Sequence, residues 1–454
     1  MDRPERERAA SSARQEAAQL TAQNIHGVAL TWVDNAGLTR VKAIPTTRLA
    51  HTARWGVGMS PVFDVYLTDD SSVMSRHIGG PDGDLRLFPD LDRLTLLAAQ
   101  PGWAWAPVDR YEQDGEPYAA CQRRFARRMT ERAADRGIEL RMGFETEWVV
   151  VRRGAADDGE LAYACSGPAY GMARLVELSG YLRDVLEALA AQRVDVLQIH
   201  PEYSPGQFEI SVSPKDPVGA ADLVVLVRET VRAVSLRHGL DALFGPVVEP
   251  GGVGNGAHLH LSLWRDGRDL CRGGDGPCGM TDECEAFLAG VLRELPALLA
   301  LGAPSPASRL RLEPSHWAGA FQCWGLENRE AALRFVTGAP DDAGGANAEI
   351  KCFDPAANPY LVVGAVTAAG LAGIDAGLRL PAPVAGDPAV TGEKQPRLPT
   401  SPAEVLACFE GSALLRAALG DPLFEAIAAV RRAEAAQYEG VAPRDIAAAT
   451  RGRY

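Results

Sequence analysis

Acidic and histidine side chains occupy alternate positions in separate segments of this chain. In MGFETEWVV, Glu145 and Glu147 stand two residues apart, and in AHLHLSLW the same spacing relates His258, His260 and Ser262. Because successive side chains of a β-strand point to opposite faces, each set shares one face, while apolar residues occupy the other. Both segments therefore predict strands with one polar, ionisable face.

The same pattern returns in HPEYSPGQFEISV and in AEIKCF. Gln207 and Glu209 share a face, with Glu202 just before a Pro-Gly turn, and Glu349 shares a face with Lys351. Any one of the four segments could be the solvated face of an antiparallel sheet. Four of them in one chain favour a single cavity that all four polar faces line.

Such a cavity would hold five carboxylates and an imidazole, and its chemistry follows from their charge. Carboxylates this close together cannot all stay ionised without counter-charge, so we expect bound divalent cations. Oxygen-rich ligation with a single imidazole suits Mg²⁺ or Mn²⁺ better than Zn²⁺ or copper. The pattern therefore predicts a metal cluster at this face of the sheet.

Two further features would serve a charged ligand. Arg309, Arg311, Arg329 and Arg334 lie within 26 residues. Arginines beside a carboxylate–metal cluster are suited to clamp phosphate oxygens and a substrate carboxylate, with structural salt bridges as the alternative. The stretch GGVGNGA (251–257) contains G-x-G-x-x-A, but a strand follows where a dinucleotide site requires a helix. We interpret its glycines as allowing close approach of a ligand.

The elements that must position these side chains alternate along the chain. A hairpin around the turn DNAG (34–37) and further strand over 84–97 predict a small β-rich unit that ends near residue 115. Beyond it we expect strands over 138–152, 194–212, 257–264 and 347–353, and helices over 172–192, 216–238, 282–301 and 360–379. This order predicts an α+β protein with an N-terminal domain over 1–115 and a larger catalytic domain over 116–454.

Composition limits the partners and the compartment. The 454 residues carry a formal net charge of −13, which disfavours nucleic acid and anionic membranes as partners. The longest apolar run, 360–374, is too short to span a bilayer and predicts a buried core helix. The N-terminus lacks an apolar signal core, and the gaps between Cys271, Cys278 and Cys284 miss the spacing of zinc sites. We expect an intracellular protein in which these cysteines are loop thiols.

The motifs GFETE, HPEYSPGQFEI, GNGAHLHLS, ENREAALR and AEIKCFDPAANPY resemble, in this order, the successive motifs of the glutamine synthetase superfamily. The resemblance covers nearly the whole chain and implies an N-terminal β-grasp domain and a catalytic domain whose antiparallel sheet lines the active site. It implies a cytoplasmic, ATP-dependent carboxylate–amine ligase that phosphorylates the γ-carboxylate of glutamate before an amine attacks. It also implies two or three Mg²⁺ or Mn²⁺ ions, and hexameric rings or a dodecamer in which a neighbour's N-terminal domain completes each site.

The resemblance also implies roles for individual residues. The residues expected to bind metal are Glu147, Glu202 and Glu209 for a first ion and Glu145, His258 and Glu349 for a second. Those expected to bind the nucleotide are His260 and Ser262, with Arg329 and Arg334 on its phosphates. The backbone of Gly254 and the side chain of Arg311 are expected to bind the amino acid. The residues expected to act in catalysis are Arg329, Arg334 and Glu349.

Departures from the family pattern concern the amine and the acid. Trp317 stands where ammonia-using enzymes carry an acidic residue; an indole offers apolar area and cation–π attraction to an organic ammonium, unless it is core filler. Asp64, in FDVYLTDDSS, would be the relic of an ammonium-binding aspartate, and Tyr170 would border the amine site. Lys351 replaces a second arginine on the amino acid. These changes resemble the branch that joins glutamate to ethanolamine, polyamines, alkylamines or arylamines.

Three alternatives remain open from the sequence. The first is an ordinary ammonia-dependent glutamine synthetase, against which Trp317 argues. The second is a non-catalytic relative, which the intact set of ligand positions disfavours, because clustered carboxylates without a metal are costly to keep. The third is phosphoryl transfer to a different acceptor.

Overall fold

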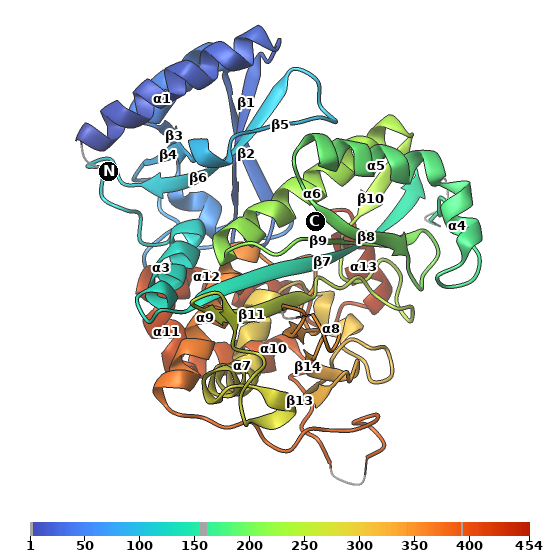
Figure 1. Cartoon of the computed structure of the whole chain (residues 1–454). Coiled ribbons are helices and arrows are strands. Elements are labelled where there is room, and N and C mark those ends of the chain that lie inside the picture. Colours follow the sequence, from blue (N-terminus) through green and yellow to red (C-terminus); the bar gives the residue numbers. More distant parts are fainter. Residues whose placement is uncertain (1–2, 155–160, 343, 392–393) are drawn as a thin grey trace.

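The computed structural model describes residues 3–154, 161–342, 344–391 and 394–454. Two sheets organise these residues, one of six strands near the N-terminus and one of nine strands that runs through the rest of the chain. Figure 1 shows the first sheet in blue beside helix α1, and the C-terminal helices in orange and red around the lower part of the second sheet. The predicted α+β class is confirmed by this arrangement.

The first sheet has the strand order β2-β1-β6-β4-β3, with β5 paired to β6. Its strands are β1 (Gly27–Val33), β2 (Thr39–Pro45), β3 (Val57–Met59), β4 (Leu85–Pro89), β5 (Thr95–Leu96) and β6 (Trp103–Tyr111). The predicted hairpin is β1–β2, which pairs Val33 with Thr39 across the turn. Helices α1 (Arg3–Ala22) and α2 (Leu49–Trp55) and the 3-10 turns η1 (Thr46–Arg48), η2 (Pro61–Val65) and η3 (Leu91–Arg93) complete this part.

The second sheet has the order β13-β14-β15-β11-β7-β9-β8, with β10 paired to β7 and β12 to β11. Its strands are β7 (Glu139–Arg152), β8 (Val196–Pro201), β9 (Gln207–Val212), β10 (Leu240–Leu243), β11 (Leu259–Arg265), β12 (Arg268–Asp269), β13 (Phe321–Leu326), β14 (Ala331–Val336) and β15 (Asn347–Ile350). All four segments with alternating ionisable residues lie in this sheet or at its strand ends. Every pairing is antiparallel except that of β13 with β14.

A group of helices supports this sheet. The helices of this part are α3 (Gln122–Ala134), α4 (Met172–Glu177), α5 (Ser179–Ala191), α6 (Pro217–Arg237), α7 (Asp282–Gly302), α8 (Ser308–Arg311) and α9 (Pro359–Asp375), with the 3-10 turn η4 (Pro277–Gly279). The C-terminal helices are α10 (Pro402–Gly411), α11 (Ala413–Leu419), α12 (Asp421–Gln437) and α13 (Pro443–Thr450). Helix α9 packs against α7, α3 and α6, and it is buried over nearly its whole length, as the apolar run predicted.

Helix α9 begins at a well-defined cap. The Asn358 side chain accepts hydrogen bonds from the backbone of Tyr360 and Leu361, and Pro359 occupies the first helical position. Among the described residues, no helix is long and apolar enough to cross a membrane.

Two predicted elements are each divided in the structure. The helix expected over 172–192 is interrupted at Leu178, whose ψ of 21° is not helical, and forms α4 and α5. The strand expected over 194–212 is split into β8 and β9 by a turn at Pro205-Gly206, where Gly206 has φ of +66°. The left-handed φ favours glycine, and the turn lets β8 and β9 pair antiparallel.

The two sheets are joined by buried hydrogen bonds and by one continuous hydrophobic core. Asn358 at the start of α9 donates to the Val33 carbonyl oxygen at 2.9 Å, and Arg431 of α12 donates to the Asn35 carbonyl oxygen at 2.5 Å. The buried Glu434 carboxylate accepts a hydrogen bond from Thr68. The predicted domain boundary at residue 115 lies between β6 and α3 and stays a prediction.

The cysteines differ from expectation at one point. Every cysteine is a free thiol, but Cys284 lies within α7 rather than in a loop. Its Sγ is buried 3.5 Å from the Sγ of Cys271. Two of the three clustered thiols, Cys271 and Cys284, are therefore buried in the core, and Cys278 is exposed.

Candidate active site

The register of the second sheet places its ionisable side chains next to one another. Opposite Glu209 of β9 lie Glu147 of β7 on one side and His200 of β8 on the other. Directly paired residues of an antiparallel sheet have Cβ atoms about 5 Å apart. Three ionisable groups from three strands therefore form a single row.

A second row crosses the strands on the other side of β7. Opposite Glu349 of β15 lie Arg334 of β14 and His260 of β11. Glu145 of β7 lies between the two rows, and its Oε1 is 3.3 Å from His260 Nε2. The alternation seen in the sequence is thus translated by strand pairing into a continuous ionisable surface.

A cavity of about 390 Å³ opens over this surface. Twelve of the predicted site residues line it: Glu145, Glu147, Tyr170, Glu202, Glu209, Gly254, His258, Arg311, Trp317, Arg329, Arg334 and Lys351. Glu349 is buried directly behind them, in contact with His258. His260 and Ser262 line an adjoining cavity of about 430 Å³, which shares Glu145 with the first.

His258 is at the centre of the acidic cluster. Its Nδ1 lies 3.0 Å from Glu145 and 3.3 Å from Glu349, while its Nε2 lies 3.1 Å from the Arg311 guanidinium. Burial and the nearby Lys351 ammonium lower the pKa of His258 to about 4, so its imidazole is neutral at physiological pH. A neutral imidazole beside two carboxylates is a competent metal ligand.

Burial and mutual repulsion perturb the carboxylates of the first row. Burial, reinforced by Glu209 and Glu202, raises the pKa of Glu147 to about 8. Burial likewise raises the pKa of Glu209 to about 7, against the opposing hydrogen bond from His200. A divalent cation bound between these two acids would favour their ionised forms and lower both pKa values.

The second row has its own counter-charges. Burial alone would raise the pKa of Glu349, but Lys351, His260 and His258 lower it to about 2. The Lys351 ammonium is 3.0 Å from Glu349, and the Arg334 guanidinium is also 3.0 Å from it. Glu349 therefore stays ionised in a fully buried position.

This donor set fits divalent cations. Three groups bring ligand atoms within 4.8 Å of one another: Glu145, His260 and Glu349; Glu145, Glu209 and His258; and His200, Glu202 and Glu209. Carboxylate oxygens dominate each group, as Mg²⁺ and Mn²⁺ prefer. Glu147 belongs to none of the three groups, and its Oε2 accepts hydrogen bonds from Gln207 and the Gly256 amide.

His200 is a site residue that sequence reasoning missed. Its ring nitrogens lie 3.4 Å from Glu202 and 3.3 Å from Glu209, and the hydrogen bond to Glu209 raises its pKa to about 9. The signal was available, because His200 precedes Glu202 by two residues near the end of a strand. The same spacing had identified Glu145 with Glu147.

Two glycines explain the glycine-rich stretch. A Cβ on Gly254 would come within 2.2 Å of the Pro246 carbonyl oxygen, and one on Gly256 within 2.3 Å of His258 Nε2. Beside them lies the buried Arg311, whose Nη1 has no hydrogen-bond partner among the described residues. A buried, unpaired guanidinium nitrogen facing a cavity is suited to a carboxylate ligand.

An aromatic wall closes one side of the cavity. Tyr203 makes edge contacts with Trp317, at 5.2 Å between ring centroids, and with Tyr170, at 5.8 Å. The Tyr170 hydroxyl donates to Glu202 at 2.6 Å. Trp317 is 48% exposed, so it is not core filler. Sequence reasoning missed Tyr203, whose aromatic type alone does not distinguish a cavity wall from the core.

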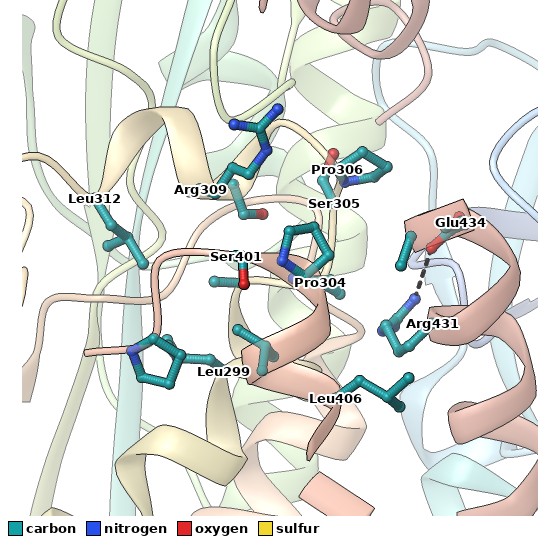
Figure 2. A pocket seen from close by; sticks show the side chains of 16 residues that line it. Leu299, Pro304, Ser305, Pro306, Arg309, Leu312, Ser401, Leu406, Arg431 and Glu434 are labelled. Atoms are coloured by element: carbon teal, nitrogen blue, oxygen red, sulfur yellow. Dashed lines mark hydrogen bonds and ion pairs between the residues drawn. The ribbon is translucent and has the colours of Figure 1, made fainter. Parts of the chain in front are cut away.

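Two predicted or candidate residues lie elsewhere. Asp64 of η2 is fully buried and paired with Arg110 at 2.9 Å, so the structure does not bring it to this cavity. Arg309 lines a separate, largely apolar cavity between α8, α10 and α12 (Figure 2). In that cavity the visible ion pair joins Arg431 to Glu434 at 3.0 Å.

Comparisons with known proteins agree with this geometry. Residues 119–447 match the family model described as glutamine synthetase, catalytic domain. The chain is 56% identical to gamma-glutamylpolyamine synthetase GlnA3 of Streptomyces coelicolor, covering 96% of this chain and 95% of that protein. It is 30% identical to the glutamine synthetase of Pyrococcus abyssi, covering 76% of this chain and 74% of that one.

Solved structures give the same result. A crystal structure described as a novel glutamine synthase homolog has a TM-score of 0.85 and 32% identity, covering 95% of this chain and 99% of that one. The complex of GmaS with ADP has a TM-score of 0.82 and 26% identity, covering 94% and 96%.

The catalytic domain and its acidic, arginine-lined cavity are those of an ATP-dependent carboxylate–amine ligase. The chain belongs to the glutamine synthetase family. The family and enzyme class predicted from the motifs are thereby confirmed.

Proposed function

We propose that this protein joins the γ-carboxylate of glutamate to a polyamine, at the expense of ATP and through a γ-glutamyl phosphate. The observation that carries the proposal is the aromatic wall. Trp317, Tyr203 and Tyr170 present ring faces and edges where a cationic, partly apolar amine would lie. The high identity to a γ-glutamylpolyamine synthetase supports the same substrate class.

The residues that would hold the metal ions are those of the acidic cluster. We assign Glu147, Glu202 and Glu209 to one ion and Glu145, His258 and Glu349 to another, as the family resemblance implies. The groups of close ligand atoms support Glu202 with Glu209, to which His200 is added as a candidate ligand, and Glu145 with His258 and with Glu349, while Glu147 lies outside them. Bound Mg²⁺ or Mn²⁺, two or three ions in all, would neutralise phosphate charge and polarise the transferring phosphoryl group.

The arginines would act on the anionic groups. Arg334 is held between Glu349 and Glu327, at 3.0 Å and 2.5 Å, with its planar fork at the cavity. Arg329 is exposed and lines the cavity without an ion pair among the described residues, so it is free to bind phosphate. These two arginines and Glu349 form the catalytic set, while His260 and Ser262 contact the nucleotide.

The acid and the amine would approach from two sides. Arg311 and the Gly254 backbone would bind the α-carboxylate and amino group of glutamate, with Lys351 nearby as a point charge. After phosphoryl transfer, the neutral amine nitrogen would attack the acyl carbon and phosphate would leave as the C–N bond forms. Trp317 and Tyr170 would bind the remaining ammonium and methylene groups of the amine.

The assembly and compartment complete the proposal. We propose a cytoplasmic homo-oligomer of hexameric rings or a dodecamer, in which a neighbour's N-terminal sheet covers the cavity. The aromatic wall supports this, because three half-exposed rings in mutual contact form an apolar surface that a partner subunit would cover.

Product mass spectrometry tests the substrate assignment. The full-length protein is incubated with ATP, Mn²⁺ or Mg²⁺ and glutamate, with ammonia, ethanolamine, putrescine, spermidine, methylamine or benzylamine in parallel reactions. We expect γ-glutamyl amides of putrescine and spermidine, little glutamine, and no product from a Glu349→Gln variant. Glutamine as the main product would identify an ordinary synthetase, and absence of any amide would favour a non-catalytic relative or another acceptor.

A further inference from the structure

Arg174, in the short helix α4, is a buried charged residue that does not itself line the cavity. Arg174 is only 1% exposed. It lies next to the cavity, because it hydrogen-bonds to the backbone of Glu202 and Tyr203, which line it. Within the part of the chain that the structure describes, no carboxylate lies within ion-pair distance of its guanidinium. A charge in this position needs other partners, because an unpaired buried ion is costly.

Backbone carbonyl oxygens supply those partners. Arg174 Nη1 donates to Glu202 at 2.7 Å and to Ser204 at 2.8 Å, and Nη2 donates to Tyr203 at 3.2 Å. Nε donates to the Gly167 carbonyl oxygen at 3.1 Å, and Nη2 also donates to that atom. One guanidinium therefore binds four carbonyl oxygens from two separate segments.

Those segments carry the amine side of the cavity. The turn between β8 and β9 holds Glu202 and Tyr203, and the loop after Gly167 holds Tyr170. The two segments meet where the Tyr170 hydroxyl donates to Glu202 and where the Tyr170 ring stacks on His200 at 5.4 Å. Arg174 lies behind this junction and fixes both backbones to one rigid, planar group.

Only arginine has the donors for this geometry. Its fork presents five N–H groups in one plane, whereas a lysine ammonium has three donors at a single point. A lysine at position 174 would reach some of the four carbonyl oxygens but not all of them. A glutamine would lose the charge and most of the donors.

We propose that Arg174 is a positioning residue for the amine subsite, which sets the Tyr170–Glu202 junction and the edge of Tyr203 without touching substrate. The inference rests on the proposed γ-glutamyl–amine ligase function. Its specific content is that Arg174 acts mainly on amine binding and leaves the binding of glutamate unchanged, while ATP is affected only through the proposed metal ligand Glu202. Arg311 and Arg334 make their hydrogen bonds elsewhere in the described structure, Arg311 with His258 and Lys351 and Arg334 with Glu349 and Glu327.

Steady-state kinetics of Arg174→Lys and Arg174→Gln in the full-length chain test the proposal. We expect the KM for the amine to rise at least tenfold in Arg174→Gln and by less in Arg174→Lys. The KM for glutamate should stay within twofold of the wild type in both variants, and the KM for ATP should rise by a smaller factor than the KM for the amine. The conservative variant keeps the test informative where the glutamine variant folds poorly.

Arg228 provides a matched control. It is also a buried arginine that donates to a carbonyl oxygen, that of Pro355 at 2.9 Å, but it lies on α6 and does not line the cavity. Arg228→Gln should lower Tm without changing the ratio of the amine KM to the glutamate KM. A rise of that ratio in Arg228→Gln equal to that in Arg174→Gln would overturn the proposal.

A double variant tests whether Arg174 acts on the amine KM through the hydrogen bond between Tyr170 and Glu202. Tyr170→Phe removes the hydroxyl that donates to Glu202, so Arg174→Gln should raise the amine KM by a smaller factor in this background. Amine and glutamate KM values that rise together, or unchanged kinetics with only a lower Tm, would show a general structural role and refute the inference.

Failure of the two proposals can be told apart. If the wild type forms glutamine instead of polyamine amides, the polyamine proposal fails in the wild-type reaction. The Arg174 comparison then continues with ammonia as the varied substrate, and the same selective rise in KM is expected.

Discussion

Trp317 decides the character of the amine subsite at the scale of the single residue. An indole next to Tyr203 offers a negative ring face and apolar area, but it cannot accept a proton from ammonium. An amine with methylene groups gains from that surface, whereas ammonium has no apolar part to bury. The side chain therefore favours a larger cation over a smaller one.

Trp317→Ala should weaken polyamine use selectively. A cation–π contact contributes about 0.5–2 kcal/mol, which corresponds to a decrease in kcat/KM for putrescine of roughly 2- to 30-fold. Trp317→Phe, which keeps a ring, should retain most of the activity, and the KM for glutamate should not change in either variant. Wild-type kinetics in Trp317→Ala would show that the indole does not bind the amine.

Metal removal should change stability in a pH-dependent way. Burial raises the pKa of Glu147 to about 8 and of Glu209 to about 7, and ion pairing raises that of His200 to about 9. Between pH 6.5 and 9 the metal-free folded chain thus binds more protons than the unfolded chain, so its stability falls as pH rises. In the folded chain Glu349 and His258, with pKa values of about 2 and 4, titrate below this window, and His258 opposes the trend only near pH 6.5, where the unfolded imidazole still binds protons.

Thermal unfolding with EDTA and with Mn²⁺ checks this. The Tm of the metal-free protein should fall from pH 6.5 to 9, while the increase in Tm on adding Mn²⁺ should grow, because the metal replaces protons. Glu147→Gln removes one titrating group and should flatten the metal-free curve. An equal Mn²⁺ effect at both ends of the window would contradict the link between protons and metal.

At the scale of the elements, the strands and helices show which features the sequence could predict. The alternation of side chains along a strand predicted that Glu145 and Glu147 share a face. The same two-residue spacing between His200 and Glu202 would have added His200 to the predicted site. The alternation within one segment does not show which strands are neighbours in the sheet. The pairing of Glu349 with His260 and Arg334 therefore could not be derived from the sequence. The break at Leu178 did leave a signal, because Ser179 and Gly180 follow it directly, but the prediction of one continuous helix passed over it.

Asp64 illustrates the same limit at an element junction. Its position in FDVYLTDDSS suggested an amine ligand, but η2 places it against Arg110 of β6, Tyr118 and Gln122 of α3. Long-range partners of a buried charge cannot be read from neighbouring residues. The junction between the first sheet and α3 is built on this carboxylate.

Asp64→Asn should therefore act on stability. The variant keeps the shape but leaves the Arg110 guanidinium, 1% exposed, without its counter-charge. Breaking such a buried pair costs about 3–5 kcal/mol, measurable as a lower denaturant midpoint. Asp421→Asn, at an exposed pair with Arg416, should shift the midpoint far less, because water screens an exposed ion pair. If Asp64→Asn kept the wild-type denaturant midpoint and raised the KM for the amine, Asp64 would instead belong to the amine site.

At the scale of the whole molecule, one continuous hydrophobic core includes residues of both sheets. Arg431 and Glu434 of α12 and Asn358 at the start of α9 hydrogen-bond to the N-terminal part of the chain, at Asn35, Thr68 and Val33. Removing residues 1–115 would expose that core. A loss of activity in such a truncation would therefore reflect unfolding, and it would not show whether subunits share an active site.

Assembly is better tested in the intact chain. The aromatic wall of Tyr170, Tyr203 and Trp317 is open in the single subunit, and the proposed ring would cover it with a neighbour's N-terminal sheet. We expect mass photometry to show hexamers or dodecamers, and polyamine ligation to fall in parallel with these species as dilution or mild urea dissociates them. Circular dichroism at each step separates dissociation from unfolding. A folded monomer with full specific activity would show that one chain builds the complete site, and the neighbour would then have no part in binding the amine.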